Sequence, residues 1–155
     1  MITALLVDDE KRNHDSLSGL LKEYCPTVEV IGKASSVDEA LQFISNQKPQ
    51  LVFLDIEMPE MSGLSFVKSM KQAPMVIFVT AHRDYALDCY EVSPIDFLLK
   101  PLELDRFFKS IEKVRQRISM PPETAKLEPY FYIRENLNYV QIAYKDVLYM
   151  KANES

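Results

Sequence analysis

The chain has 155 residues, with 18 basic and 23 acidic side chains and a formal net charge of −5. An acidic body does not attract a phosphate backbone by its overall charge, so we expect any nucleic-acid contact to be local. The three glycines are scattered and the two histidines are far apart, which excludes glycine-rich phosphate loops and multi-histidine zinc sites. The two cysteines are also isolated, as is usual in a reducing cytosol.

Five short apolar runs recur at even spacing along the chain. They are Ile2–Val7, Val28–Ile31, Leu51–Leu54, Met75–Val79 and Ile95–Leu99. Segments with helical period separate these runs, and strands that alternate with helices indicate βαβ units and a parallel sheet. The sequence therefore predicts an α/β fold with a five-stranded, doubly wound parallel sheet.

The helices are marked by apolar residues three or four positions apart. One stripe begins at Leu17 and another at Val37, where residues 36–39 form a capping box. The clearest helix spans residues 104–118, with acidic residues at its start and basic residues toward its end, as the helix dipole favours. Residues 84–92 are a weaker helix because they lack a clean apolar stripe.

The composition changes after residue 118. Three prolines between residues 119 and 129 predict a linker over 119–128, so we expect residues 1–118 to form one domain. Residues 129–155 hold five of the eight tyrosines and have the aromatic alternation of β-strands. So short a β-rich fragment has no core of its own, and we expect it to begin a domain whose remainder is missing.

The first apolar run has no basic residues before it and is followed directly by Asp8. No apolar run approaches the ~20 residues that a membrane helix requires. We therefore expect a soluble, cytoplasmic protein without a membrane partner.

Reactive side chains follow four of the five predicted strands. They belong to Asp8, Asp9, Asp55, Thr80 and Lys100. Ligands of open parallel sheets bind beyond the carboxyl ends of the strands, so these groups should meet at one rim. Taken singly, the carboxylates and the hydroxyl are ordinary helix-cap or turn residues, and the lysine is an ordinary solvated one.

Three carboxylates at one rim require compensation. Two carboxylates ~4 Å apart repel by about 4 kcal/mol at an effective dielectric constant of ~20. A cluster of three therefore needs a cation or raised pKa values. Because the cluster offers only oxygen ligands, the sequence predicts a Mg²⁺ site.

Four motifs, in this order, resemble the receiver domain of two-component response regulators. They are Val7–Glu10, Leu54–Pro59 with Gly63, Thr80-Ala81 and Leu99–Pro101. The resemblance covers residues 1–118 and implies a flavodoxin-like sheet of order 2-1-3-4-5. The run 84–101 is similar to the LytTR subgroup, and the tail is similar to the first strands of a LytTR DNA-binding domain.

The resemblance implies a role for each rim residue. Asp55 matches the phosphoacceptor, which receives a phosphoryl group from a sensor histidine kinase. Mg²⁺ would bind the side chains of Asp9 and Asp55, Asp8 through a water molecule, and the main-chain carbonyl of Glu57.

A second group of residues matches the phosphorylation switch. Lys100 pairs with the phosphoryl group in the family, Thr80 closes onto it, and Phe97 turns inward when Thr80 moves. Plain core packing is the alternative for Phe97. The Lys100-Pro101 bond matches a cis peptide.

Two further positions flank the water that attacks the phosphoryl group in receivers. They are occupied here by Glu57 and His82. Both side chains are large and polar, so they either order that water or obstruct it. The resemblance implies that they tune dephosphorylation.

Three functions remain open. The first is a phosphorylation-controlled transcription regulator that dimerises on activation and binds DNA through its missing C-terminal part; its only chemistry takes place at Asp55. The second is a Mg²⁺-dependent phosphohydrolase, but haloacid dehalogenases have an Asp-x-Asp motif on the first strand, whereas the nucleophile here follows the third. The third is a receiver that acts only through protein contacts, against which the β-rich tail argues.

The tail itself is not basic, since residues 127–155 carry three basic and four acidic side chains. We expect its strands to pair edge to edge with the tail of a neighbouring chain, because an unpaired strand edge templates pairing. A hairpin lying on its own receiver is the alternative.

Overall fold

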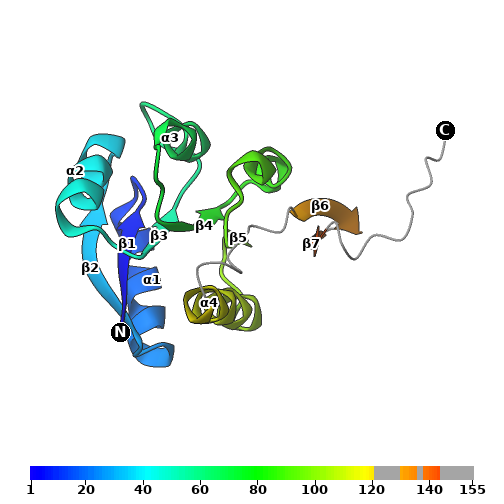
Figure 1. Ribbon diagram of the computed structural model, residues 1–155, viewed down its shortest axis with the longest axis horizontal. Coiled ribbons are helices and arrows are strands. Elements are labelled where there is room, and N and C mark those ends of the chain that lie inside the picture. The colour runs from blue at the N-terminus through cyan, green and yellow to red at the C-terminus, as the bar shows by residue number, and fades with distance from the viewer. Residues whose placement is uncertain (121–129, 136–137, 144–155) are drawn as a thin grey trace.

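The computed structural model describes residues 1–120, 130–135 and 138–143. Five parallel strands form one sheet in the order β2-β1-β3-β4-β5 (Figure 1). The strands are β1 (Ile2–Val7), β2 (Val28–Ala34), β3 (Leu51–Leu54), β4 (Met75–Thr80) and β5 (Asp96–Leu99). The predicted fold class and strand order are confirmed.

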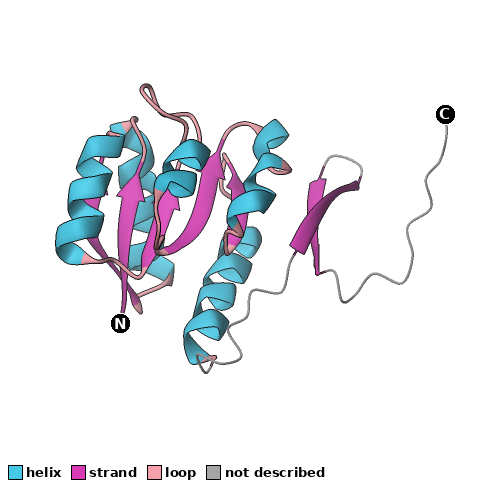
Figure 2. Cartoon of the chain, turned by 45° about the horizontal axis from the view of Figure 1, so that its top comes forward, coloured by secondary structure: helices cyan, strands magenta, loops and turns pink. Residues whose placement is uncertain are grey.

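Helices cover both faces of this sheet, so the fold is doubly wound. They are α1 (Lys11–Tyr24), α2 (Val37–Gln47), α3 (Gly63–Ser69) and α4 (Leu104–Ser119), with two 3₁₀ helices, η1 (Arg83–Tyr85) and η2 (Asp88–Val92). α1 and α4 lie on one face, and α2, α3 and η2 lie on the other (Figures 1 and 2).

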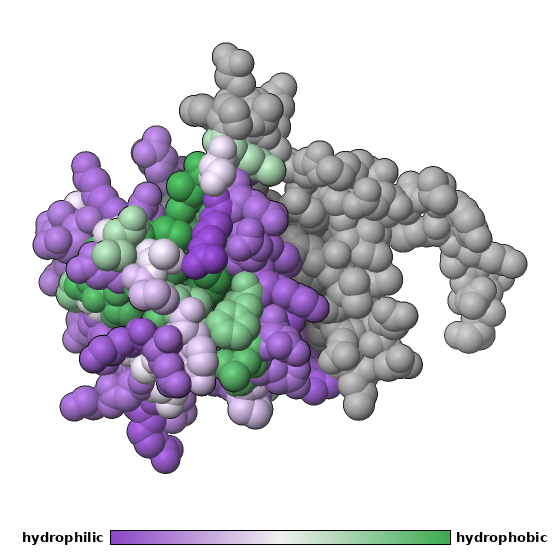
Figure 3. Space-filling view, turned by 90° about the horizontal axis from the view of Figure 1, so that it is seen from below, coloured by the Kyte–Doolittle hydropathy of each residue, from purple (hydrophilic) through white to green (hydrophobic). Residues whose placement is uncertain are grey.

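The core has two halves because β3 is buried on both faces. Leu51 and Phe53 belong to the half beneath α1 and α4, whereas Val52 and Leu54 belong to the half beneath α2 and α3. This alternation along an uninterrupted apolar run is typical of central parallel strands. Some hydrophobic side chains are exposed at the surface. On the face shown in Figure 3, hydrophilic residues surround the hydrophobic ones.

Local signals set the ends of the helices. Ser36 Oγ accepts a hydrogen bond of 3.2 Å from the backbone N–H of Glu39, as the predicted cap requires. The returning bond differs from a standard capping box, because the Glu39 carboxylate accepts from Ser35 N–H at 2.7 Å. The weak helix at 84–92 is shorter and tighter than an α-helix, being split into η1 and η2.

The tail contains two strands, β6 (Tyr130–Glu135) and β7 (Asn138–Ala143), which form an antiparallel hairpin. Residues of β6 lie near η2. The aromatic alternation of the tail also predicts a third strand at Asp146–Met150, but this segment and most of the expected linker lie outside the described residues. No helix in the described part of the chain is both long and apolar enough to cross a membrane.

Candidate functional site

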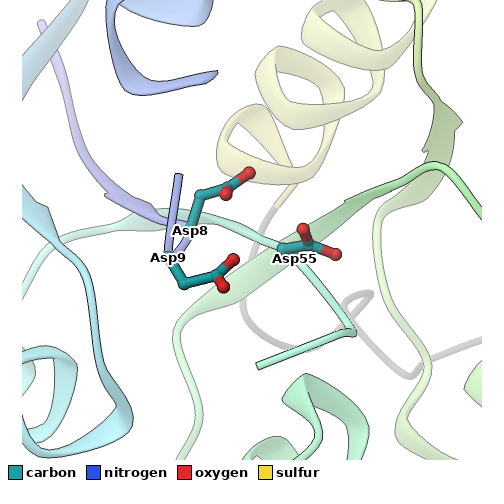
Figure 4. A group of neighbouring side chains, drawn as sticks. All are labelled: Asp8, Asp9 and Asp55. Carbon is teal, nitrogen blue, oxygen red and sulfur yellow. The ribbon is translucent and has the colours of Figure 1, made fainter. Parts of the chain in front are cut away.

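Three carboxylates meet at the carboxyl ends of β1 and β3. Asp8 and Asp9 follow β1, and Asp55 follows β3, its direct neighbour in the sheet (Figure 4). One oxygen atom of each carboxylate lies within 4.8 Å of an oxygen atom of the other two. Asp8 and Asp55 are buried and Asp9 is exposed, so the cluster is reached from the rim of the sheet.

Backbone turns hold the two buried carboxylates in place. Asp55 Oδ1 accepts a hydrogen bond of 3.1 Å from Glu57 N–H. Asp8 Oδ1 accepts from Glu10 N–H at 2.8 Å and from the side-chain amide of Asn13 at 3.1 Å. In each residue these bonds occupy one carboxylate oxygen and leave the other to face the cluster.

Gly63 allows α3 to start against the strand end that carries Asp55. Its N–H donates a hydrogen bond of 2.7 Å to the carbonyl of Ile56. A Cβ atom at this position would overlap the carbonyl oxygen of Asp55, so only glycine fits without moving the backbone.

Lys100 joins the two buried carboxylates from the end of β5. Its Nζ atom lies 2.7 Å from Asp8 Oδ2 and 2.9 Å from Asp55 Oδ2. Its backbone N–H donates to the carbonyl of Thr80 at 2.8 Å, and the bond to Pro101 is cis as expected. One ammonium group among three carboxylates leaves a net charge of −2.

The electrostatics of this pairing shift two pKa values. Burial raises the pKa of Asp55, and the hydrogen bond from Lys100 opposes this shift without cancelling it. Burial lowers the pKa of Lys100, but its hydrogen bonds to Asp8 and Asp55 outweigh burial and raise that pKa above its ordinary value. Lys100 is therefore protonated and carries a positive charge at the site.

Thr80 and Phe97 lie on the neighbouring strands. Thr80 is fully buried at the end of β4, and its hydroxyl oxygen accepts from His82 N–H at 3.3 Å. Phe97 on β5 is buried in the half of the core beneath α2, α3 and η2, together with Ala86 and Cys89. The ring therefore points into the protein.

Glu57 and His82 face each other. The Nε2 atom of His82 lies 2.8 Å from Oε2 of Glu57, and each side chain is about half exposed. Both residues are identified in the sequence by their positions. Their direct contact could not be predicted from the sequence, because that contact depends on how the loops after β3 and β4 approach each other. The structure thus gathers every predicted rim residue at one edge of the sheet, with Phe97 in the core beside it.

A comparison with protein-family models places residues 4–112 in the response regulator receiver domain. The chain belongs to this receiver family. An uncharacterized response regulatory protein from Shewanella oneidensis is 40% identical over 121 residues, which cover 77% of this chain and 51% of that protein. The sensory transduction protein LytT of Bacillus anthracis is 38% identical over 120 residues, which cover 76% of this chain and 48% of LytT.

A solved structure shows the same receiver fold. The response regulator domain of CheB from Thermotoga maritima is 28% identical, with a TM-score of 0.64, and the match covers 79% of this chain and 99% of that one. This receiver spans about half the length of the two curated relatives described above.

Sequence reasoning missed one contributor to the receiver site. Asn13 in the first turns of α1 donates to Asp8 and so fixes its carboxylate. Its position five residues after Asp8, at the start of a helix, is the only signal that the sequence offered for this contact.

Proposed function

We propose that this receiver accepts a phosphoryl group on Asp55 from a sensor histidine kinase. The carboxylate attacks phosphorus, a new bond forms between its oxygen and phosphorus, and the bond from phosphorus to the donor's leaving group breaks. The observation that carries the proposal is the position of Asp55 at the rim of the sheet, where it clusters with Asp8 and Asp9 and pairs with Lys100.

The donor set fits Mg²⁺. Three carboxylates with oxygen atoms within 4.8 Å of one another, and no histidine or cysteine among them, offer the hard oxygen ligands that this ion prefers. Asp9 and Asp55 would bind through their side chains, Asp8 through water and Glu57 through its main-chain carbonyl. When bound, Mg²⁺ lowers the repulsion between Asp55 and the incoming phosphate.

Lys100 and Thr80 would then stabilise the phosphorylated form. The ammonium group of Lys100 offsets the charge of about −1.5 to −2 that the phosphoryl group adds, and the hydroxyl of Thr80 donates to one of its oxygens. Because Lys100 N–H is bonded to the Thr80 carbonyl, β4 and β5 respond together. Phe97, buried beside them, would couple this response to the face formed by η2, β5 and α4.

The response would pass to a DNA-binding output. We propose that residues 1–118 form the receiver, 119–128 the linker and 129–155 the start of a LytTR-type DNA-binding domain. The β6–β7 hairpin and the LytT relatives support this division. The whole protein would act in the cytoplasm, dimerise on activation and regulate transcription through DNA contacts made beyond residue 155.

Intact-mass spectrometry tests the phosphorylation. With acetyl phosphate and Mg²⁺ we expect the addition of one phosphoryl group, which is lost when a chelator is present and in the Asp55→Ala variant. Asp38→Ala removes an exposed carboxylate on α2 and should leave the yield unchanged. An equal yield in Asp55→Ala would refute the assignment, and sustained turnover of a small phosphate ester would favour the phosphohydrolase.

A further inference from the structure

A cavity of 630 Å³ adjoins the carboxylate cluster on the α1 and α4 side of the sheet. Its volume lies within the range of about 300–1,000 Å³ that is typical of small-molecule sites. Residues of α1 line one wall and the segment 100–102, before α4, lines another. An occupant would therefore touch the same lysine that pairs with Asp55.

Most of the wall is apolar. Eight apolar residues line it, from α1, three strands and the segment after β5: Val7 and Pro101, and a group of six, Leu6, Leu17, Leu20, Phe53, Val79 and Leu102. All six belong to, or pack against, the half of the core beneath α1 and α4. Such a wall favours a rigid apolar or aromatic body, which loses little conformational entropy on binding.

One polar group in this wall has no partner. His14 exposes only 4% of its surface and lines the cavity. Its Nε2 atom is the one buried side-chain nitrogen or oxygen without a hydrogen-bond partner within the described part of the chain. Buried polar groups are almost always hydrogen-bonded. The missing partner of Nε2 therefore suggests that a ligand group supplies this hydrogen bond.

The charges at the cluster end define the ligand further. Asp8 and Asp55 both line the cavity, and the single ammonium of Lys100 is already paired with them. An anion would be repelled there, and the apolar remainder of the wall would desolvate a cation, so a neutral ligand is favoured. A hydroxyl group both donates and accepts, so it can pair with either neutral tautomer of His14.

We propose that this cavity binds a small, neutral aromatic molecule that carries one hydroxyl group, a ligand of the phenol class. Its ring packs among the leucines and its hydroxyl bonds Nε2 of His14. The inference goes beyond phosphorylation, because His14, Leu17 and Leu20 take no part in the proposed transfer.

Titration of 4-propylphenol into the ¹⁵N-labelled chain, without Mg²⁺, tests the site. We expect saturable shifts of the backbone signals of residues 13–20 and 100–102 and of the imidazole nitrogens of His14. Unsaturable or scattered shifts would mean that water alone fills the cavity, and this would overturn the proposal.

Two variants locate the ligand. His14→Phe keeps a ring in place but removes the nitrogen, and we expect it to weaken binding by about fivefold, the effect of one hydrogen bond. Ser16→Trp adds bulk at an exposed lining position and should block binding, whereas Lys22→Trp, on the same helix outside the lining, should not. Unchanged affinity in His14→Phe or in Ser16→Trp would refute the site.

Discussion

His82 Nε2 and Glu57 Oε2 lie 2.8 Å apart, so the loops that follow β3 and β4 are joined beside Asp55, the proposed phosphoacceptor. The two residues stand two positions after Asp55 and two positions after Thr80. Each therefore limits the positions that the other can adopt, and we expect the pair to act as a unit on the water that would attack the phosphoryl group.

We predict that Glu57→Ala and His82→Ala each change the dephosphorylation rate at least several-fold. Because the side chains contact each other, the effect of the double variant should differ from the product of the single effects. Mg²⁺ affinity should stay nearly constant, since Glu57 would bind through a carbonyl that any residue supplies. The decay of the phosphorylated mass measures the rates.

Glu60→Ala provides the control for this cycle, because it removes an exposed negative charge from the same loop without touching the pair. Its decay rate should match that of the parent. Equal decay rates in Glu57→Ala, His82→Ala and the parent would show that these side chains do not control dephosphorylation.

Thr80→Val tests the switch. Valine keeps the β-branched shape at this fully buried position but cannot donate to a phosphoryl oxygen. We expect Asp55 still to be phosphorylated, while the NMR shift changes around Phe97 on phosphorylation are largely lost. Thr27→Val, at an exposed position, should retain them. Full retention in Thr80→Val would show that the hydroxyl does not drive the change.

A third buried carboxylate, Asp96, lies on β5 with no exposed surface and holds α4 against the sheet. It accepts hydrogen bonds from Arg106 and, at 2.6 Å, from Ser110, and Lys113 Nζ lies 3.1 Å away. Asp96→Asn leaves these cations facing a neutral group, and we expect a loss of about 3 kcal/mol in the free energy of unfolding. Urea denaturation measures it, with Asp105→Asn at the exposed start of α4 as the control.

The same carboxylate predicts a pH dependence. Burial would raise the pKa of Asp96, but the hydrogen bond from Arg106 and the charge of Lys113 outweigh burial and hold it below its usual range. Its stabilisation is therefore complete above the unfolded-state pKa of about 3.9 and is lost as the pH falls through the lower folded-state pKa. In Asp96→Asn the free energy of unfolding should therefore fall less steeply as the pH is lowered. The same acid dependence in the variant and the parent would show that Asp96 does not stabilise the fold through these ion pairs.

The sequence predicted the strands and the rim residues because both depend on local patterns. A strand covered on both faces is an apolar run, and its carboxyl end places the next residue at the rim. Asp96 escaped this reasoning, since it sits inside such a run and its partners lie on the following helix. The Glu57–His82 contact and the unpaired Nε2 of His14 depend likewise on tertiary packing.

The last prediction concerns the tail. The β6–β7 hairpin has strand edges that can pair with another chain, and we expect two hairpins to join edge to edge and so dimerise residues 1–155. The position of β6 near η2 supports the alternative, in which the hairpin lies on its own receiver. Light scattering of residues 1–155 and 1–122 separates the two. A dimer of the longer chain and a monomer of the shorter one is the expected result, whereas the same state in both would refute pairing through the tail.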